Sequence, residues 1–246
     1  MSKARIRLYV DQPLGEGQSV PLSRAQAHYL FAVMRRRAGD ALVIFNNTDG
    51  TFRARVSRAD KRHGELACAT KMRDVQMPPD LWLAFAPVKK ARTDYIVEKA
   101  CEMGVARILP VRTEFTGSER IRQDRLQAHA IEAAEQCGAG YVPEVTGMTR
   151  LDTLLANWPA ERRILFCNEA ATAAADSVLA RAAPGPWAVL IGPQGGFSQA
   201  ERDAINAMQQ TAEVSLGPRI LRADTAAVAA LTLWQMALGD WRPAPR

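Results

Sequence analysis

The sequence is poor in the residues that build metal sites and disulfide frameworks. It has three histidines and four cysteines in 246 residues, and no two cysteines form a CxxC pair. Zinc sites and disulfide frameworks need clustered or regularly spaced ligands. We therefore expect no metal ion and no disulfide, and we expect the widely spaced cysteines to be buried or semi-buried small hydrophobic residues; they are Cys68, Cys101, Cys137 and Cys167.

Long hydrophobic runs are also missing. No apolar stretch approaches the roughly 18 residues that a membrane-spanning helix needs. The first residues, MSKARIRLYVDQ, lack the apolar segment and the cleavage site of a signal peptide. The sequence therefore predicts a cytoplasmic protein without a membrane segment. An apolar content of 48% is enough for hydrophobic cores, and the length suits two domains.

The nucleotide-binding fingerprints GxGxxG and GxxxxGK[ST] do not occur in the chain. Each has a spacing that the geometry of phosphate binding requires. A nicotinamide-dependent oxidoreductase and a P-loop nucleotide triphosphatase thereby lose their main support.

Positive charge is concentrated in the first third of the chain. Residues 1–74 carry 14 Lys and Arg against seven Asp and Glu, a net charge of +7, whereas residues 75–246 carry 18 against 19, a net charge of −1. Lys and Arg bind phosphates and release counterions. The asymmetry favours a polyanion-binding module joined to a nearly neutral body, and a solvated basic face without a partner is the alternative.

The chain divides at residues 75–80, VQMPPD, where two prolines interrupt the pattern. Residues 1–74 contain short apolar runs between turn signals and one amphipathic stretch, residues 23–36. This pattern predicts a small β-barrel with one helix.

Residues 81–246 alternate continuous apolar strands with helical sequence. Such alternation is typical of an α/β domain whose parallel sheet is covered on both faces, and ligands bind beyond the carboxyl ends of its strands. The last expected helix, residues 224–238, is apolar nearly all round. We expect it to be buried against the sheet or against a second subunit.

Three strand ends are candidates for a binding site: residues 165–169, 190–197 and 216–222. The second contains GPQGG, residues 192–196, and enters a helix through a capping box that begins at Ser198. Its glycines would let backbone groups approach a ligand closely, or would simply allow a tight strand-to-helix turn. The third carries Ile220 and Leu221 in an irregular stretch, where they would pack on an adenine ring.

Four segments together resemble the bacterial small-subunit (16S) rRNA uridine-N3 methyltransferase family (RsmE), within the SPOUT superfamily. They are GPQGG, residues 192–196; LGPRILRADTA, residues 216–226; EKACEMGV, residues 98–105; and EAAEQCGAGYVPE, residues 132–144. The resemblance covers essentially the whole chain. GPxGG alone is unspecific, whereas the combination is specific.

The resemblance implies a PUA-like RNA-binding barrel over residues 1–74 and a SPOUT methyltransferase domain with a trefoil knot over residues 81–246. It further implies a homodimer that methylates N3 of a uridine in the decoding region of the assembled small ribosomal subunit. The methyl donor, S-adenosylmethionine, would be held by residues of the three strand ends: Phe166, Cys167, Asn168, Leu190, Gly192, Pro193, Gly195, Gly196, Leu216, Gly217, Ile220, Leu221 and Arg222.

Three segments depart from the family's usual sequence. Gln194 stands where the family has Glu in GPEGG, so no role that needs a negative charge is assigned there. Ala139 replaces the arginine that usually follows EQCG, which puts a substrate contact at that position in doubt. The family's LRTET reads LRADT here, with Asp224 in place of the glutamate.

Methylation of N3 requires that its proton leave. We assign Arg222 to stabilise negative charge on the uracil carbonyls, and Asp224 to orient Arg222 or to accept the proton; an ordinary helix N-cap is the alternative for Asp224. We expect Arg7, in the first strand, to bind RNA, and we expect the same of three arginines along the exposed side of the barrel helix, Arg35, Arg36 and Arg37. The alternative for these three is a solvated helix end without a partner.

Two further functions stay open. Another SPOUT enzyme that methylates a ribose hydroxyl or a different base would use the same donor site. A non-catalytic RNA-binding or ribosome-assembly factor would keep the fold, and the departures at Gln194 and Ala139 favour it.

Overall fold

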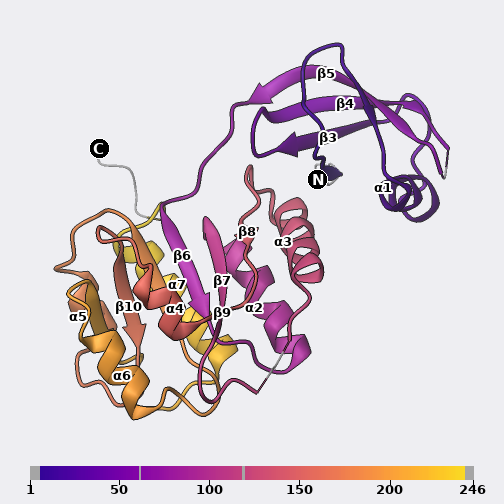
Figure 1. Ribbon diagram of the computed structural model, residues 1–246. Coiled ribbons are helices and arrows are strands. Elements are labelled where there is room, and N and C mark those ends of the chain that lie inside the picture. Colours follow the sequence, from indigo (N-terminus) through magenta and orange to yellow (C-terminus); the bar gives the residue numbers. More distant parts are fainter. Residues whose placement is uncertain (1–5, 61, 118–119, 242–246) are drawn as a thin grey trace. The chain divides into compact units, whose positions relative to one another are not determined.

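The computed structural model describes residues 6–60, 62–117 and 120–241 (Figure 1). The chain forms two compact units. The first contains the described residues up to Met77 together with Ala134–Val142, and the second contains Pro78–Ala133 and the described residues from Pro143 onward. Residues 74–79, between the last strand of the first unit and Asp80, form neither helix nor strand. The sequence had assigned 134–142 to the methyltransferase domain, and our assignment of residue ranges to domains stays a prediction.

A curled five-stranded sheet forms the first unit. Its order is β1-β3-β4-β5-β2; β1 runs parallel to β3 and the other pairs are antiparallel. Register shifts between β4 and β5 bend the sheet, as β-bulges do, around an apolar core that includes Val10, Leu30 and Leu66. The strands are β1 (Arg7–Tyr9), β2 (Ser19–Pro21), β3 (Ala41–Asn46), β4 (Gly50–Arg58) and β5 (Glu65–Arg73).

The predicted helix over residues 23–36 is shorter than expected. A capping box of Ser23 and Gln26 starts α1 (Arg24–His28), which continues as one turn of π-helix, η1 (Tyr29–Val33). The backbone N–H of Arg36 then donates to the carbonyl of Leu30 at 2.9 Å, while Arg35 has a left-handed φ of 53°. This bond and the left-handed residue end the helix; a left-handed residue is common just after a helix C-terminus. The expectation that Arg35, Arg36 and Arg37 lie along the helix is wrong, because the chain has already left it.

The second unit is built on a parallel sheet with the order β12-β10-β11-β6-β7-β8; a short strand, β9, pairs with β7. β10 lies between β12 and β11, and the three strands run parallel. Their carboxyl ends therefore meet at one edge of the sheet. The strands are β6 (Leu81–Phe85), β7 (Arg107–Arg112), β8 (Glu144–Val145), β9 (Thr149–Arg150), β10 (Arg163–Cys167), β11 (Trp187–Ile191) and β12 (Thr211–Val214).

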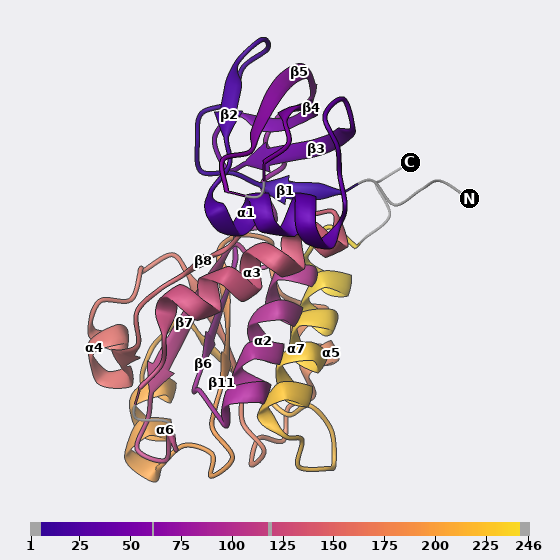
Figure 2. The same cartoon turned by 90° about the vertical axis from the view of Figure 1, so that its right-hand side faces the viewer.

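Helices cover both faces of this sheet. In Figure 2, α2 and α7 pack side by side, and α4 and α6 lie on the opposite side of the strands. The N-terminal part of α3 pairs with α2 through an ion pair of Arg125 with Asp94. The helices are α2 (Lys90–Glu102), α3 (Gln123–Cys137), α4 (Leu151–Ala156), α5 (Ala175–Leu179), α6 (Gln199–Asn206) and α7 (Ala223–Ala237).

Only one face of α7 is buried within the described chain. Ala227, Leu231 and Trp234 contact the interior, whereas Met236 is 62% exposed. The amide of Gln235 is fully buried and donates to the carbonyl of Met103 at 2.6 Å. The helix that the sequence predicted to be buried against the sheet or a second subunit is thus buried on one side, where it contacts β11 and where small alanines let it pack closely against α2. Among the described residues, no helix has the length and apolarity to cross a membrane.

Candidate functional site

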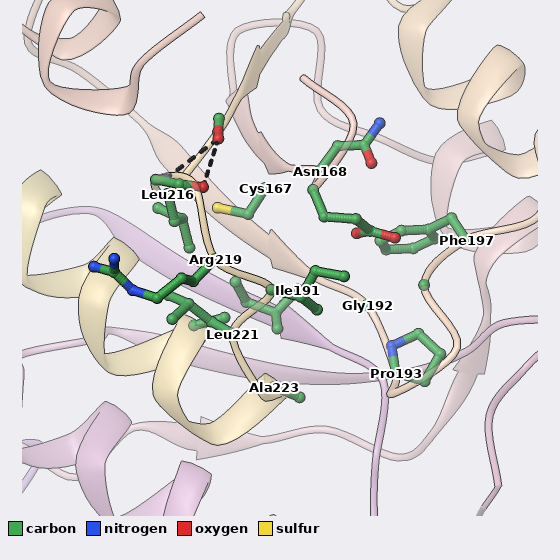
Figure 3. A pocket seen from close by; sticks show the side chains of 16 residues that line it. Cys167, Asn168, Ile191, Gly192, Pro193, Phe197, Leu216, Arg219, Leu221 and Ala223 are labelled. Carbon is green, nitrogen blue, oxygen red and sulfur yellow. Dashed lines mark hydrogen bonds between the residues drawn. The ribbon is translucent and has the colours of Figure 1, made fainter. Parts of the chain in front are cut away.

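A cleft opens beyond the carboxyl ends of β10, β11 and β12 (Figure 3). Ligands of parallel sheets bind at this edge. Arg219 and Leu221 lie on one side of it in Figure 3, and Asn168 and Phe197 lie on the other. The lining residues are Cys167, Asn168, Glu169, Ile191, Gly192, Pro193, Gly196, Phe197, Ser215, Leu216, Gly217, Arg219, Ile220, Leu221, Ala223 and Ala226.

Asn168 joins the ends of two strands. It directly follows β10, its backbone N–H donates to Val214 of β12 at 3.0 Å, and its side-chain amide donates to Glu213 at 2.6 Å. The side-chain oxygen accepts from the N–H of Ala170. Because Asn168 is 5% exposed and bonded on both sides, it fixes this wall of the cleft before any ligand binds.

Cys167 ends β10 and also lines the cleft. Although part of the residue is exposed, burial of its thiol raises the pKa of Cys167 to about 12. The side chain is therefore a neutral apolar group at physiological pH. It does not supply a nucleophile.

Two aromatic rings explain why Gly192 follows β11. Phe166 and Phe197 pack edge to face, with ring centroids 5.2 Å apart. A Cβ on Gly192 would lie 2.7 Å from Cε2 of Phe197. Gly192 has no side chain because the ring of Phe197 lies against its backbone. Phe166 is completely buried and supports the ring of Phe197 from behind.

The next two glycines have different surroundings. Gly196 has a φ of +69°, and a Cβ on it would lie 2.7 Å from Oε1 of Glu169. Gly195 instead lies against Phe115: a Cβ on Gly195 would approach the Cβ of Phe115 to 3.1 Å and the ring atom Cγ to 3.4 Å. The GPQGG segment is thus both a tight strand-to-helix turn and a wall of the cleft, the two interpretations that the sequence left open.

The third segment supplies the apolar side of the cleft. After β12 the backbone turns at Gly217, whose φ is +116°, and the hydroxyl of Ser215 bonds to Gly217. Ile220 is 85% exposed although it is a large aliphatic residue, and Leu221 beside it is half-buried. An aliphatic surface left open next to a cleft suits a flat apolar ligand.

Arg222 and Asp224 lie at the start of α7. Arg222 is the N-cap residue, and its exposed side chain does not line the cleft, although its neighbours Leu221 and Ala223 do. Asp224 accepts from the N–H of Thr225 and pairs with Arg92, with 3.6 Å between Oδ2 and Nε. Asp224 is therefore not the N-cap, and its ionic partner is Arg92 rather than Arg222.

Most of the predicted donor-binding residues come together in the cleft, and four do not line it: Phe166, Leu190, Gly195 and Arg222. Phe166 and Leu190 are interior strand residues. Sequence reasoning missed lining residues that flank the three motifs or follow them: Glu169, Ile191, Phe197, Ser215, Arg219, Ala223 and Ala226. All but Ala226 lie inside or next to one of the three predicted segments. Their position in the sequence beside the predicted residues could therefore have identified them. The assignment of these residues to a donor stays a prediction.

Arg7 makes contacts inside the first unit. Its Nη2 donates to the carbonyl of Ala139 at 2.7 Å, and its guanidinium lies 4.7 Å from the ring centroid of Phe45. Burial lowers the pKa of Arg7. The position where the family usually carries an arginine thus contributes a backbone oxygen here. Whether Arg7 also contacts RNA stays a prediction.

Arg35, Arg36 and Arg37 differ from one another in exposure. Arg35 and Arg37 are exposed, whereas Arg36 is half-buried, and its Nε has no hydrogen-bond partner. A non-glycine residue with left-handed φ, such as Arg35, costs about 1–2 kcal/mol, and such strain often accompanies function. RNA binding by the three stays a prediction. Over the parts of the chain that the structure describes, no three His, Cys, Asp or Glu side chains gather to hold a metal ion.

Known proteins with this sequence pattern are RNA methyltransferases. The RNA methyltransferase domain family matches residues 75–235, and the RNA methyltransferase PUA domain family matches residues 22–67. A ribosomal RNA small subunit methyltransferase E from Rickettsia conorii is 28% identical over 230 residues, which cover 92% of this chain and 93% of that protein.

Two solved structures resemble the whole chain. One is a protein from Legionella pneumophila described as a methyltransferase in complex with the cofactor SAM; it is 30% identical, with a TM-score of 0.88, and the match covers 96% of this chain and 99% of that one. The other is a ribosomal RNA small subunit methyltransferase E from Neisseria gonorrhoeae bound to S-adenosyl methionine, with 27% identity, a TM-score of 0.88 and coverage of 97% and 100%. The chain belongs to the RNA methyltransferase family, and it combines the catalytic domain of that family with its PUA domain.

Proposed function

We propose that this enzyme transfers a methyl group from S-adenosylmethionine to N3 of a uridine in the decoding region of 16S rRNA, in the assembled small ribosomal subunit. The observation that carries the proposal is the cleft formed by three strand ends, in a chain similar along almost its entire length to small-subunit rRNA methyltransferases. We further propose that the enzyme is a cytoplasmic homodimer with a trefoil knot and without a metal ion.

The cleft suits S-adenosylmethionine in its chemistry. Ile220 and Leu221 offer an aliphatic surface for adenine, and Gly192 and Gly196 let backbone groups approach the ligand. Glu169 lines the cleft and has no cationic partner among the described residues, so its carboxylate is available to a positively charged ligand. Glu169 thus places a negative charge beside the GPQGG turn, in which Gln194 is uncharged. When bound, S-adenosylmethionine supplies an electrophilic methyl group.

The protein's part in the reaction is to orient the uracil ring and to manage its charge. Arg222, between two residues that line the cleft, would donate hydrogen bonds to the uracil carbonyls as negative charge develops on them. Of the two roles considered for Asp224, orienting Arg222 or accepting the N3 proton, the second is retained, since its ionic contact is with Arg92 and not with Arg222. Correct alignment with exclusion of water supplies several kcal/mol more.

The test is transfer of labelled methyl to small ribosomal subunits from cells that lack this protein, followed by nucleoside analysis, with naked rRNA as control. We expect the label in 3-methyluridine, and in the subunits rather than in naked rRNA. Label in another nucleoside would replace the target, and donor binding without any label would favour an assembly factor.

Arg222→Ala tests the catalytic assignment. Loss of a preorganised donor typically lowers kcat by a factor of about 10²–10³, and we expect that loss with little change in donor affinity. Arg181→Ala, an exposed arginine outside the cleft, is the matched control. A methylation rate within a fewfold of wild type would remove Arg222 from the mechanism.

A further inference from the structure

A tight turn follows β7 and presents an aromatic ring. The N–H of Thr116 donates to the carbonyl of Thr113 at 3.2 Å, the N–H of Thr113 donates to the hydroxyl of Thr116 at 2.8 Å, and the two hydroxyls lie 2.8 Å apart. Thr113 is buried. Because its ends are bonded in this way, the conformation of the turn is fixed without a ligand.

The same turn is attached to α6. The backbone N–H of Glu114 donates to Oε1 of Glu201 at 2.7 Å, and the other carboxylate oxygen of Glu201 accepts from the N–H of Ser198 at 3.0 Å. Ser198 is the N-cap of α6 and directly follows the GPQGG turn. One carboxylate therefore couples the turn after β7 to the segment that lines the cleft.

Phe115, at the tip of the turn, is 48% exposed. Its Cβ and Cγ lie where a Cβ on Gly195 would meet them at 3.1 and 3.4 Å. The ring is thus in contact with the GPQGG segment on one side and open on the other. A rigid, half-exposed aromatic ring is the usual platform for an unpaired nucleobase.

A second hollow is lined in part by the first turn of α6, through Ser198 and Glu201, and in part by Arg112, Thr113, Glu114 and Arg150. Arg150 is already paired with Asp152 at 2.6 Å. The exposed Arg112 has no acidic partner among the described residues. A guanidinium three residues from an exposed ring is the combination that binds a nucleotide through its phosphate and its base.

We propose that Phe115 stacks on an RNA base next to the methylated uridine and that Arg112 binds a phosphate of the same segment. Stacking would hold the RNA strand against the GPQGG segment, so that the target base enters the cleft. The inference rests on the proposed function, since it presumes an RNA substrate. Phe115 is a positioning residue here, because it touches the substrate strand and not the reacting atoms.

The main test compares Phe115→Leu and Phe115→Trp. Leucine keeps an apolar side chain but lacks a π-face, so we expect the Kd for small subunits and the KM to rise about tenfold. Tryptophan should retain near wild-type values, and the affinity for S-adenosylmethionine and kcat should change less than about threefold in both. Trp241→Leu, which removes another ring that is 48% exposed, is the matched control and should change nothing.

Arg112→Gln tests the phosphate contact separately. Loss of one such contact should lower the slope of log Kd against log salt concentration by about 0.7–0.9. An unchanged slope would remove Arg112 from the proposal.

Other outcomes for Phe115→Leu overturn the stacking proposal. Unchanged affinity for small subunits would show that the ring does not bind RNA. Loss of affinity for S-adenosylmethionine alone would show that the ring supports the cleft. A changed oligomeric state would show that the ring belongs to a protein interface. If wild type forms no 3-methyluridine, the proposed function fails, whereas the stacking proposal is still decided by the binding of subunits to wild type and variants.

Discussion

At the scale of single residues, the three glycines of the GPQGG turn are small for three different reasons. Gly192 makes room for Phe197, Gly195 for Phe115, and Gly196 takes a left-handed conformation beside Glu169. Only Gly196 combines a backbone requirement with a contact to a charged residue of the cleft. Substitution there should change donor binding as well as stability.

We predict that Gly196→Ala weakens the binding of S-adenosylmethionine about fivefold or more. The left-handed backbone costs an L-residue about 1–2 kcal/mol, and a Cβ displaces the Glu169 carboxylate. Isothermal titration calorimetry measures the change. Gly147→Ala, where a Cβ makes only ordinary contact at 3.6 Å, is the control, and equal affinities of the two variants would contradict the prediction.

The reactivity of Cys167 provides a prediction about pH. Alkylation requires the thiolate, and burial holds the pKa of Cys167 at about 12. We expect iodoacetamide at pH 8 to modify the exposed Cys137 and to leave Cys167 unmodified. Peptide mapping by mass spectrometry distinguishes the two sites, and equal labelling rates would show that the sulfur is accessible and ionised.

At the scale of elements, the start of α6 connects the cleft with the turn after β7. Ser198 and Glu201 form a capping box, and Glu201 also accepts from Glu114. Local sequence predicts the capping box, because its two residues are three positions apart. The bond to Glu114 joins residues 87 positions apart and depends on the sheet.

We predict that Ser198→Ala destabilises the protein by about 1 kcal/mol, the usual cost of losing an N-cap side chain. For a domain of this size the melting temperature should fall by about 2–4 °C. Differential scanning calorimetry measures the shift. Ser177→Ala in α5, an exposed serine that caps no helix, should leave the melting temperature unchanged; a similar loss there would show that the effect is not due to capping.

At the scale of the whole molecule, the charge is divided between the two parts of the sequence, +7 over residues 1–74 and −1 over the rest. A basic PUA domain joined to a nearly neutral methyltransferase domain would separate RNA affinity from chemistry. Electrostatic binding of RNA should therefore depend mainly on the first unit.

Reversal of the charges of Arg35, Arg36 and Arg37 to Glu should flatten the salt dependence of RNA binding. Each lost phosphate contact lowers the slope of log Kd against log salt concentration by about 0.7–0.9, so three contacts would lower it by about 2–3. Fluorescence anisotropy over a salt series measures the slope. Reversal of Arg122 and Arg181, exposed arginines of the second unit, should have little effect, and an unchanged slope in the triple variant would exclude its arginines from the interface.

The sequence by itself determined the fold class and the three segments that meet in the cleft, because both depend on local patterns of apolar residues, glycines and caps. The RNA methyltransferase family followed from the resemblance of four motifs to that family. Only the tertiary structure decided what those segments contact. The end of the barrel helix before Arg35, the carbonyl of Ala139 that accepts from Arg7, and Phe115 against Gly195 all depend on backbone geometry or on residues far apart in the chain. Spacing along the sequence carries no information about such contacts, which arise only when the strand order brings distant strand ends together.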